Sequence, residues 1–329
     1  MKSFESTILN AAGAGRRKYT AICAISVFCC CLMSISATAQ IARTWTGTDS
    51  GYWGDPNNWN PYGVPQTGDY LVFGGNDSND TMTNDITGLS VDGLSFGEVS
   101  YVLKGNPLTI DNQINGLSGI FGAIDTEANG NDDTSTTTTI YCALVFTKSA
   151  VIVAASIAGT ITESTRDLYL NGAIQINESC LLTLESLAIS YEGGGNSHLI
   201  VSGAISGAGS VLASADDEGG HVSPVEFSGS SPNSFLGTLY LSTIGSSSVI
   251  FDNSAGSVVS TSLAVTNGET ANLVLDSASQ IGGNTTVIIA NGSKLSLSGS
   301  SPTVGTIAMT NVSADALPCT LDTGSTLLG

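Results

Sequence analysis

The sequence predicts an all-β protein, and within that class a right-handed parallel β-helix. Three observations support this prediction. Short apolar segments alternate with polar residues at the two-residue period of a β-strand. Turn-forming residues interrupt these segments. The 329 residues include 39 glycines, and only 11% of the residues are charged, which is low for a protein with surface helices. Finally, sequence patterns recur at intervals of roughly 20–24 residues near the C-terminal end, a period typical of solenoids.

The strand prediction is based on pairs of apolar residues that flank a single intervening residue. Each pair belongs to a short group that turn residues bound, which is typical of strands separated by turns. No amphipathic helix is expected after residue 40, because glycine recurs too often to leave a long enough segment. The pairs are Leu168 and Leu170, Ile174 and Ile176, Leu182 and Leu184, Leu273 and Leu275, and Leu295 and Leu297.

The repeat is most visible in a four-residue motif with Asn at its third position. Val265-Thr266-Asn267-Gly268 is followed 24 positions later by Ile289-Ala290-Asn291-Gly292, and 20 positions after that by Met309-Thr310-Asn311-Val312. A second echo joins Leu275-Asp276-Ser277 to Leu321-Asp322-Thr323, 46 positions away, which would be two steps of about 23. One β-helix rung of two or three short strands with their turns has this length.

In a β-helix, inward Leu, Ile and Val stack from rung to rung, so no rung is stable alone. Asn suits the turns because it tolerates left-handed backbone and its amide can hydrogen-bond between rungs. A β-sandwich or a propeller is the rival all-β architecture. Neither predicts this period without longer strands or recurring blade motifs.

The N-terminus has the pattern of a cleaved signal peptide over residues 1–39. A positive region containing Lys2 and Arg16-Arg17-Lys18 precedes an apolar run from Tyr19 to Ile35. Ala37-Thr38-Ala39 then supplies the small-x-small cleavage pattern. A retained membrane anchor is the alternative, but the run of about 17 residues is short for a spanning helix. Twin-arginine export and lipidation within Cys29-Cys30-Cys31 are less consistent with the flanking residues.

The chain after Ala39 is strongly acidic. It carries five basic residues against 27 acids, which gives a net charge of −22 with neutral His. Nucleic acid and anionic membranes are therefore not expected partners, because both require clustered Lys and Arg. Three cysteines remain, Cys142, Cys180 and Cys319, and their odd number and wide spacing do not form a disulfide framework. One bridge is possible, but we expect each thiol to pack as a small apolar group.

We divide the chain into residues 1–39 as signal peptide, 40–84 as an N-terminal capping segment rich in Trp and Gly, and 85–329 as the β-helical repeat domain. Trp45, Trp53 and Trp59 have two interpretations. They could form a carbohydrate platform, because flat aromatic faces stack on sugars. We favour packing as a hydrophobic cap on the first rung, which a solenoid requires.

Two segments carry a family resemblance. The first runs through Trp45-Thr46-Gly47, Gly51-Tyr52-Trp53, Asn58-Trp59 and Gly68-Asp69; the second runs from Leu199 to Val211 and continues through Phe227-Ser228-Gly229 and Asn233-Ser234-Phe235-Leu236-Gly237. Together they resemble exported bacterial proteins with autotransporter-associated β-strand repeats. The resemblance implies a β-helical passenger at the cell surface or outside the cell, in an adhesion-like or structural role. It transfers no catalytic residue to this sequence.

No residue is predicted to be catalytic, to bind a cofactor or to bind a metal. Asp216-Asp217-Glu218 and Asn76-Asp77-Ser78-Asn79-Asp80 contain possible calcium ligands, but neither matches an EF-hand, and solvated loops are expected. Paired acids could hydrolyse glycans, although 27 acids make chance pairs common. His198 and His221 lack zinc spacing and are expected in turns.

The sequence therefore favours a non-enzymatic, exported structural or adhesion-like protein without cofactors. Its expected partners are surface glycans or other cell-surface proteins, with no membrane insertion of the mature chain. The alternatives are a glycan-active β-helix resembling a glycoside hydrolase, or a module that binds glycan or calcium without catalysis. Leu327-Leu328-Gly329 ends the sequence in mid-pattern, so we expect that an anchor is absent or that the chain is truncated.

Overall fold

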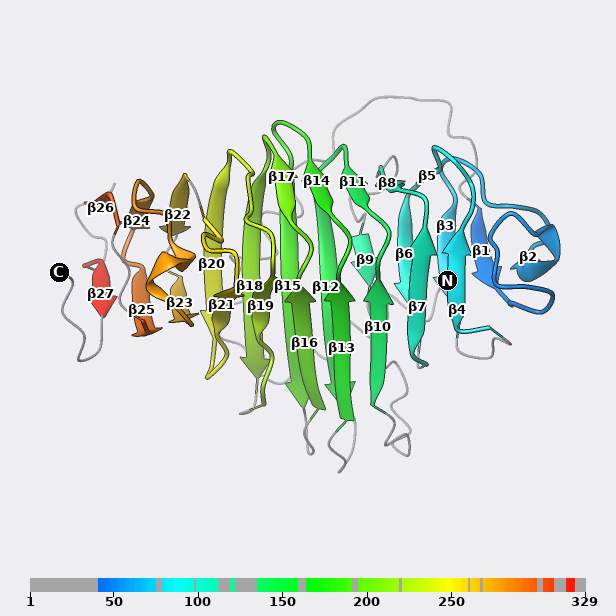
Figure 1. Ribbon diagram of the computed structural model, residues 1–329. Coiled ribbons are helices and arrows are strands. Elements are labelled where there is room, and N and C mark those ends of the chain that lie inside the picture. The colour runs from blue at the N-terminus through cyan, green and yellow to red at the C-terminus, as the bar shows by residue number, and fades with distance from the viewer. Residues whose placement is uncertain are drawn as a thin grey trace, which may run out of the picture. The chain divides into compact units, whose positions relative to one another are not determined.

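The computed structural model describes residues 41–74, 79–97, 99–111, 119–121, 135–158, 164–190, 195–218, 221–259, 261–266, 269–300, 304–310 and 318–322. All of them belong to one unit, Gln40–Gly329. This unit is a β-solenoid, in which strands from successive turns of the chain lie side by side in chain order (Figure 1). The predicted signal peptide lies outside the described residues.

Three sheets form the walls of the solenoid, and all the strand pairs described in them are parallel except that of β1 with β2. Sheet A contains, in spatial order, β2 (Trp59–Asn60), β1 (Ala42–Trp45), β3 (Tyr70–Phe73), β6 (Gly93–Phe96), β9 (Gly119–Phe121), β12 (Ala150–Ala158), β15 (Leu181–Ser190), β18 (Ser210–Glu218), β20 (Thr238–Ile244), β22 (Ser262–Val265), β24 (Thr286–Ala290) and β26 (Thr306–Thr310).

Sheet B contains β4 (Thr81–Asn84), β7 (Tyr101–Gly105), β10 (Thr136–Ile140), β13 (Ser164–Leu170), β16 (Gly195–Val201), β19 (Val225–Gly229), β21 (Val249–Asn253), β23 (Thr270–Leu275), β25 (Lys294–Gly299) and β27 (Thr320–Asp322). Sheet C contains β5 (Ser90–Val91), β8 (Leu108–Ile110), β11 (Leu144–Phe146), β14 (Ile174–Ile176) and β17 (Ile205–Gly207). Two short 3₁₀ helices, η1 (Pro56–Asn58) and η2 (Ala278–Gln280), lie between strands.

The parallel β-solenoid predicted from the sequence is confirmed, and so is the register of its clearest repeat. Val265 pairs with Ile289, and Ile289 pairs with Met309, as the echo of the Asn-containing motif predicts. Asn291 has a positive φ of 58°, as expected for Asn in a turn. The handedness of the coil and the closing role of the Trp-rich segment stay predictions.

The second echo is wrong. Leu321 pairs with Leu295, which pairs with Ala271 rather than with Leu275. Leu321 therefore occupies the position of Ala271 two rungs earlier, and the echo joined strands at unlike positions.

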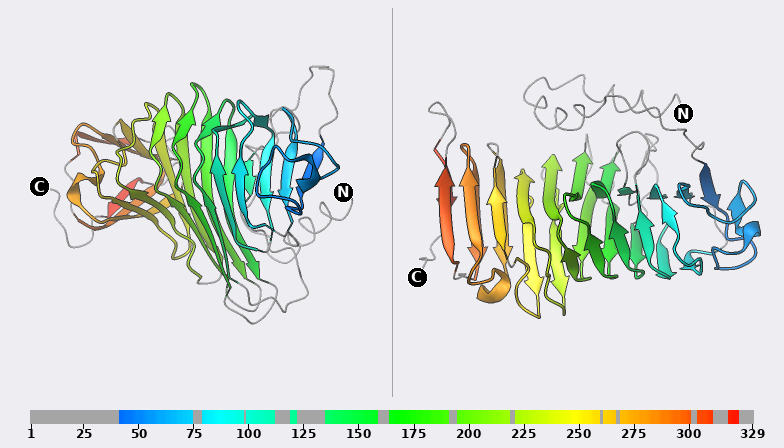
Figure 2. Two further views of the ribbon diagram at one scale, coloured as in Figure 1. Left: turned by 45° about the vertical axis from the view of Figure 1, so that its right-hand side comes forward. Right: turned by 90° about the horizontal axis from the view of Figure 1, so that it is seen from above.

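Rung length is not constant along the stack. One column of sheet A contains Ile152, Leu184, Ala213 and Leu241. More residues separate successive members of this column than separate Leu263 from its partner Val287. Part of the extra chain lengthens β12, β15 and β18 to nine or ten residues each. The parallel stacking also includes β1, β3 and β4, within residues 40–84. Figure 2 shows the strands following one another from blue to red.

Among the described residues, sheet C ends at β17, but its wall continues as irregular chain. The amide of Ser234 donates to the carbonyl oxygen of Ile205 at 2.8 Å, and that of Leu236 donates to Gly207 at 2.9 Å. Further along, the Val258 amide donates to the Gln280 carbonyl at 2.8 Å. These bonds join the third side of these rungs to their neighbours without regular strand pairing.

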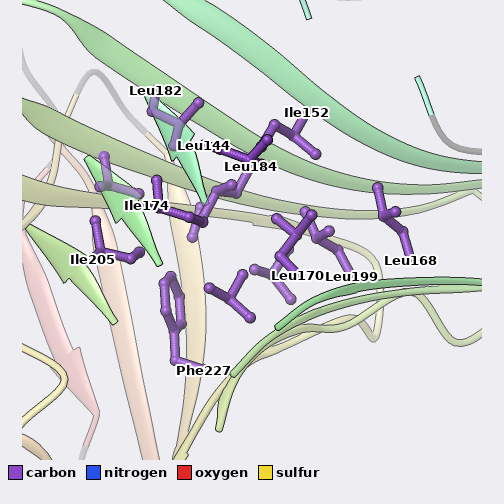
Figure 3. Packing of buried hydrophobic residues seen from close by; sticks show 14 of the residues in the cluster. Leu144, Ile152, Leu168, Leu170, Ile174, Leu182, Leu184, Leu199, Ile205 and Phe227 are labelled. Carbon is purple, nitrogen blue, oxygen red and sulfur yellow. The ribbon is translucent and has the colours of Figure 1, made fainter. Parts of the chain in front are cut away.

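The core consists of inward-facing apolar columns from all three sheets. Most strands bury every second side chain, so residues that pair across rungs stack directly on one another. In sheet B, the column Leu170, Val201, Phe227, Phe251 and Leu275 is buried. Figure 3 shows side chains of the sheets, among them Leu144, Ile152, Leu170 and Phe227, meeting in the interior.

The interior of the longer rungs also holds a polar seam, here defined as Thr136, Arg166, Ser197, Ser223 and Ser247. All five side chains are buried. Arg166 Nη1 donates to Thr136 Oγ1 at 3.0 Å, and the Ser223 and Ser247 hydroxyls lie 2.6 Å apart. The sequence prediction of an interior of Leu, Ile and Val therefore omits this part, where buried polar groups require hydrogen-bond partners.

At the N-terminal end, the three tryptophans are buried in an aromatic cluster. Trp59 makes edge contacts with Trp45 and Trp53 at ring-centroid distances of 5.0 and 5.8 Å. Trp53 stacks on Phe73, which stacks on Phe96 at 4.8 Å. Since the tryptophans are at most 3% exposed, they cannot serve as a sugar platform.

Close approach between rungs explains several of the glycines. A Cβ atom on Gly203 would lie 1.8 Å from the carbonyl oxygen of Gly172, one rung below. Gly207 adds a backbone requirement, because its φ is +107° and a Cβ there would lie 2.1 Å from the Ile176 carbonyl oxygen. Turns of this kind can be built only where the side chain is missing.

We predict that Gly203→Ala destabilises the protein by about 1–3 kcal/mol, because the added methyl group forces adjacent rungs apart. Urea unfolding followed by circular dichroism measures the change. Gly283→Ala is the matched control, since a Cβ atom at Gly283 meets nothing within 4 Å. Equal unfolding midpoints for the two variants would contradict the close-packing explanation.

Candidate functional site on the outer face of sheet B

One group of titratable side chains lies on the outer face of sheet B. We define the sheet B cluster as Asp167, Tyr169, His198, Glu226 and Asp252. In β13 the inward positions belong to the buried Leu168 and Leu170, so alternation directs Asp167 and Tyr169 outward. Asp167 pairs with His198, and Ile200 connects Tyr169 to Glu226 in the neighbouring column.

Register brings these residues together from four strands that are far apart in the sequence. Neighbouring strands are about 4.8 Å apart, so paired side chains touch. His198 Nδ1 lies 3.0 Å from Asp167 Oδ1, and both side chains are partly exposed. Asp252 pairs with Ser228, two positions beyond Glu226, and therefore lies diagonally across one rung from Glu226.

Burial and neighbouring charges act together on the cluster. Burial is the main cause that raises the pKa of Glu226, and the negative charge of Asp252 raises it further, whereas His198 and a hydrogen bond from Ser228 lower it. The pKa of Tyr169 is also raised, first by burial and then by Asp167 and Glu226. The five groups are thus one electrostatically connected set.

The chemistry available to this cluster is proton exchange and hydrogen bonding. A carboxyl group with a raised pKa beside a second carboxylate can act as an acid and base pair. Beside this pair of acids, the His198 ring lies against the Asp167 carboxylate with its Nδ1 nearest to that group. Among the described residues, no group of three or more His, Cys, Asp or Glu side chains is arranged to hold a metal ion.

One sequence expectation about acidic segments is overturned. The prediction of a solvated loop at Asp216-Asp217-Glu218 is wrong. These residues form the end of strand β18. Asp217 is only 3% exposed. Its carboxylate accepts hydrogen bonds from the His221 amide at 2.6 Å and from the Ser246 hydroxyl at 2.5 Å. Its role is therefore to join β18 to the loops that follow β18 and β20.

The segment from Asn76 to Asp80 is described only in part, because residues 76–78 lie outside the described ranges. Asn79 is structural: its side-chain amide donates to the Gly47 carbonyl oxygen, and its own carbonyl accepts from Trp45 Nε1 at 2.9 Å. It therefore supports the aromatic cluster.

The two histidines differ from each other. His221 lies outside any strand, as expected, whereas His198 lies within β16, so the turn assignment for His198 is wrong. The error arose because three consecutive glycines, Gly193 to Gly195, shortly precede His198 and resemble a turn.

The three cysteines within the described residues are free thiols, and two of them pack as expected. Cys142 and Cys180 are buried, whereas Cys319 is partly exposed. Burial raises the pKa of Cys142 to about 12, which keeps it protonated and unreactive. No thiol chemistry is therefore expected at Cys142.

The sheet B cluster was missed because its members share no sequence motif. Asp167 and His198 pair across one of the longer rungs, and so do Ile200 and Glu226. The repeat visible near the C-terminal end is shorter than these rungs and could not align them. The sequence does indicate that each of these residues points outward from its own strand. This alternation locates the cluster only when the rung lengths, and so the strand pairing, are known.

Comparison with known proteins adds no assignment: no protein-family model, no curated protein and no solved structure matches this chain. The described helices are all too short to cross a membrane. The resemblance to autotransporter-associated repeats thus stays a prediction from the quoted residues. The fold establishes the class, a parallel β-solenoid, and the particular function is a matter for proposal.

We predict that Asp217→Ala destabilises the protein by about 1.5–3 kcal/mol, because it removes a buried carboxylate that accepts hydrogen bonds from His221 and Ser246. Equilibrium urea unfolding gives the measurement. Asp276→Ala, at an exposed position, is the control and should change stability by about 0.5 kcal/mol or less. A loss for Asp217→Ala as small as that of the control would disprove the structural role.

The raised pKa values also predict a pH dependence. Glu226 and Glu185 both hold their proton more tightly in the folded protein than in the unfolded chain, Glu185 through burial alone. The free energy of unfolding should therefore fall as the pH rises above the ordinary pKa of 4.5. Glu226→Gln removes this titration, so its stability should fall less steeply over that range.

Urea midpoints measured at a series of pH values would show the difference in slope. Glu178→Gln, at an exposed position, controls for the loss of one acidic residue. If the wild type and Glu226→Gln respond identically to pH, burial of Glu226 has no energetic consequence.

Proposed function

We propose that this chain is a non-enzymatic, exported structural β-solenoid that acts at the cell surface or outside the cell in an adhesion-like role. One observation carries the proposal. The described strands of successive rungs form three walls of parallel strands around one continuous apolar core. A protein of this kind acts through a repetitive outer surface rather than through a single pocket.

The sequence supports the location. Residues 1–39 have the positive, apolar and small-residue order of a signal peptide. The remaining chain, with a net charge of −22, suits an exported protein that must stay soluble. Its proposed partners are surface glycans or other cell-surface proteins, because this charge disfavours nucleic acid.

A second candidate function, glycan hydrolysis, is favoured by one specific observation. Glu226 and Asp252 are neighbouring acids on the outer face of sheet B, and the pKa of Glu226 is raised. Glycoside hydrolases use two nearby carboxyl groups, one of which carries the proton that is given to the leaving group. The aromatic ring of Tyr169 in the same column could pack against a sugar.

The two candidates are separated by incubating purified exported protein with a panel of polysaccharides and assaying both retention and release of reducing ends. We expect saturable binding to surface glycans or cells without chain cleavage. The comparison variant is Glu226→Gln with Asp252→Asn, and Asp276→Asn is its matched control. Cleavage by the wild type that disappears only in the double variant would replace the structural proposal with the hydrolase.

A further inference from the structure

The outer face of sheet B has a central column that is mostly apolar. Starting from Tyr169 in β13, successive rungs place Ile200, Glu226, Ile250 and Val274 over one another. Each of these five side chains is partly exposed, and the residues directly before and after each of them in its strand are buried. The five therefore point outward by alternation. They form a continuous outer stripe along the stack, and such a stripe is a candidate contact surface.

Hydrogen-bonding side chains border this column on both sides. Two positions before it, in β13 and β16, lie Asp167 and His198, whose side chains are 3.0 Å apart. Two positions after it lie Asn171 and Ser202, with the Ser202 hydroxyl donating to Asn171 Oδ1 at 2.5 Å, and further along the stack Asp252. An apolar surface with a few polar groups at its borders is the usual composition of a binding site for a small organic group.

The charged groups of this face have mostly one sign. As far as β13, β16, β19, β21 and β23 are described, their outward positions carry the carboxylates of Asp167, Glu226 and Asp252 and no Lys or Arg. Two strands away from β13, the outward Lys104 of β7 has its ammonium nitrogen 5.8 Å from the ring centroid of Tyr141. The group that complements this part of the face is therefore a cation.

Glu226 is the carboxylate best placed to receive that cation. It lies within the apolar column, between Ile200 on one neighbouring strand and Ile250 on the other. Burial, and then the charge of Asp252, make its ionised form costly and raise its pKa, whereas His198 and a hydrogen bond from Ser228 lower it. A bound cation would favour the ionised form and so offset the first two effects.

Two kinds of cation fit this face poorly. Calcium takes six to eight oxygen ligands, and in the described part of the chain no three His, Cys, Asp or Glu side chains are grouped to hold a metal ion. A basic peptide can bind a sheet by adding a strand at its edge, but β16, β19 and β21 each have a strand on both sides. The occupant must therefore bind through its own polar and apolar groups.

We propose that the outer face of sheet B binds a linear glycan that carries free amino groups, such as an oligomer of glucosamine. An ammonium group lies against Glu226 and Asp252, a sugar ring packs on Tyr169, and sugar hydroxyls meet Asn171 and Ser202. The glycan runs along the column, so a repetitive ligand meets a repetitive surface. This inference rests on the proposed function, because it gives a chemical class to the surface glycans proposed above.

Isothermal titration calorimetry of the purified exported chain with glucosamine oligomers tests the proposal. We expect saturable binding that weakens as salt is added, because the charges that meet are partly exposed. Fully N-acetylated oligomers of the same length are the ligand control. Acetylation removes the positive charge and keeps the sugar rings, so the affinity should be at least about tenfold lower.

Glu226→Gln should lower the affinity for glucosamine oligomers at least about tenfold, because a neutral amide replaces the charged acceptor. Glu185→Gln is the matched control. Glu185 is also partly exposed and its pKa is also raised by burial, but it lies on the outer face of sheet A. Its variant should bind as the wild type does. Tyr169→Leu should weaken binding about fivefold through loss of the ring, and circular dichroism checks the folding of each variant.

Equal affinity for the free and the N-acetylated oligomers would overturn the role of the amine, and binding that Glu226→Gln and Tyr169→Leu leave unchanged would overturn the site. Oligolysine of equal charge that binds as tightly would indicate a surface for basic peptides and overturn the glycan. Retention of the protein on cells or other polysaccharides, without binding of glucosamine oligomers, would overturn this inference and leave the proposed function standing. Cleavage of bound oligomers would instead overturn the non-enzymatic function and support this binding face.

Discussion

The distance between neighbouring rungs, about 4.8 Å, is the constraint on which the rest of this structure depends. It fixes which residues meet, because a side chain in a strand lies directly over its counterpart one turn earlier. Inside, apolar side chains such as Phe227 and Phe251 lie at a ring-centroid distance of 5.6 Å. At the turns, the same spacing brings the Gly172 carbonyl so close to Gly203 that no side chain fits.

The fold class could be predicted because this constraint leaves a local signature. Alternating apolar residues mark each strand, and Val265, Ile289 and Met309 carry the period of the regular rungs directly. The longer rungs could not be predicted. The residues that extend β12, β15 and β18 do not recur at a fixed interval in the sequence. The irregular wall after β17 was equally hidden, since its hydrogen bonds come from segments without strand pattern.

The candidate site was predictable only in part, and the reason is register. Asp217 looks like a loop residue among three acids, yet its place at the end of β18 buries its carboxylate and supplies donors for it. His198 follows three glycines, yet it lies in a strand and its pairing partner is Asp167. In both cases the chemistry of the side chain depends on a residue of a neighbouring rung, which local sequence does not reveal.

The variation in rung length has a consequence for how the chain reaches its structure. From β9 onward, each strand of sheet A pairs with the sheet A strand of the preceding rung, so each new rung needs only the rung before it as a template. Closing a longer rung costs little more entropy than closing a shorter one, because the cost grows only with the logarithm of loop length. Folding can therefore begin at any rung and spread to its neighbours one rung at a time. The aromatic cluster around Trp59 is made entirely from the first rungs, so its packing depends on chain segments that are close in sequence, whereas the later columns depend on rungs added one at a time.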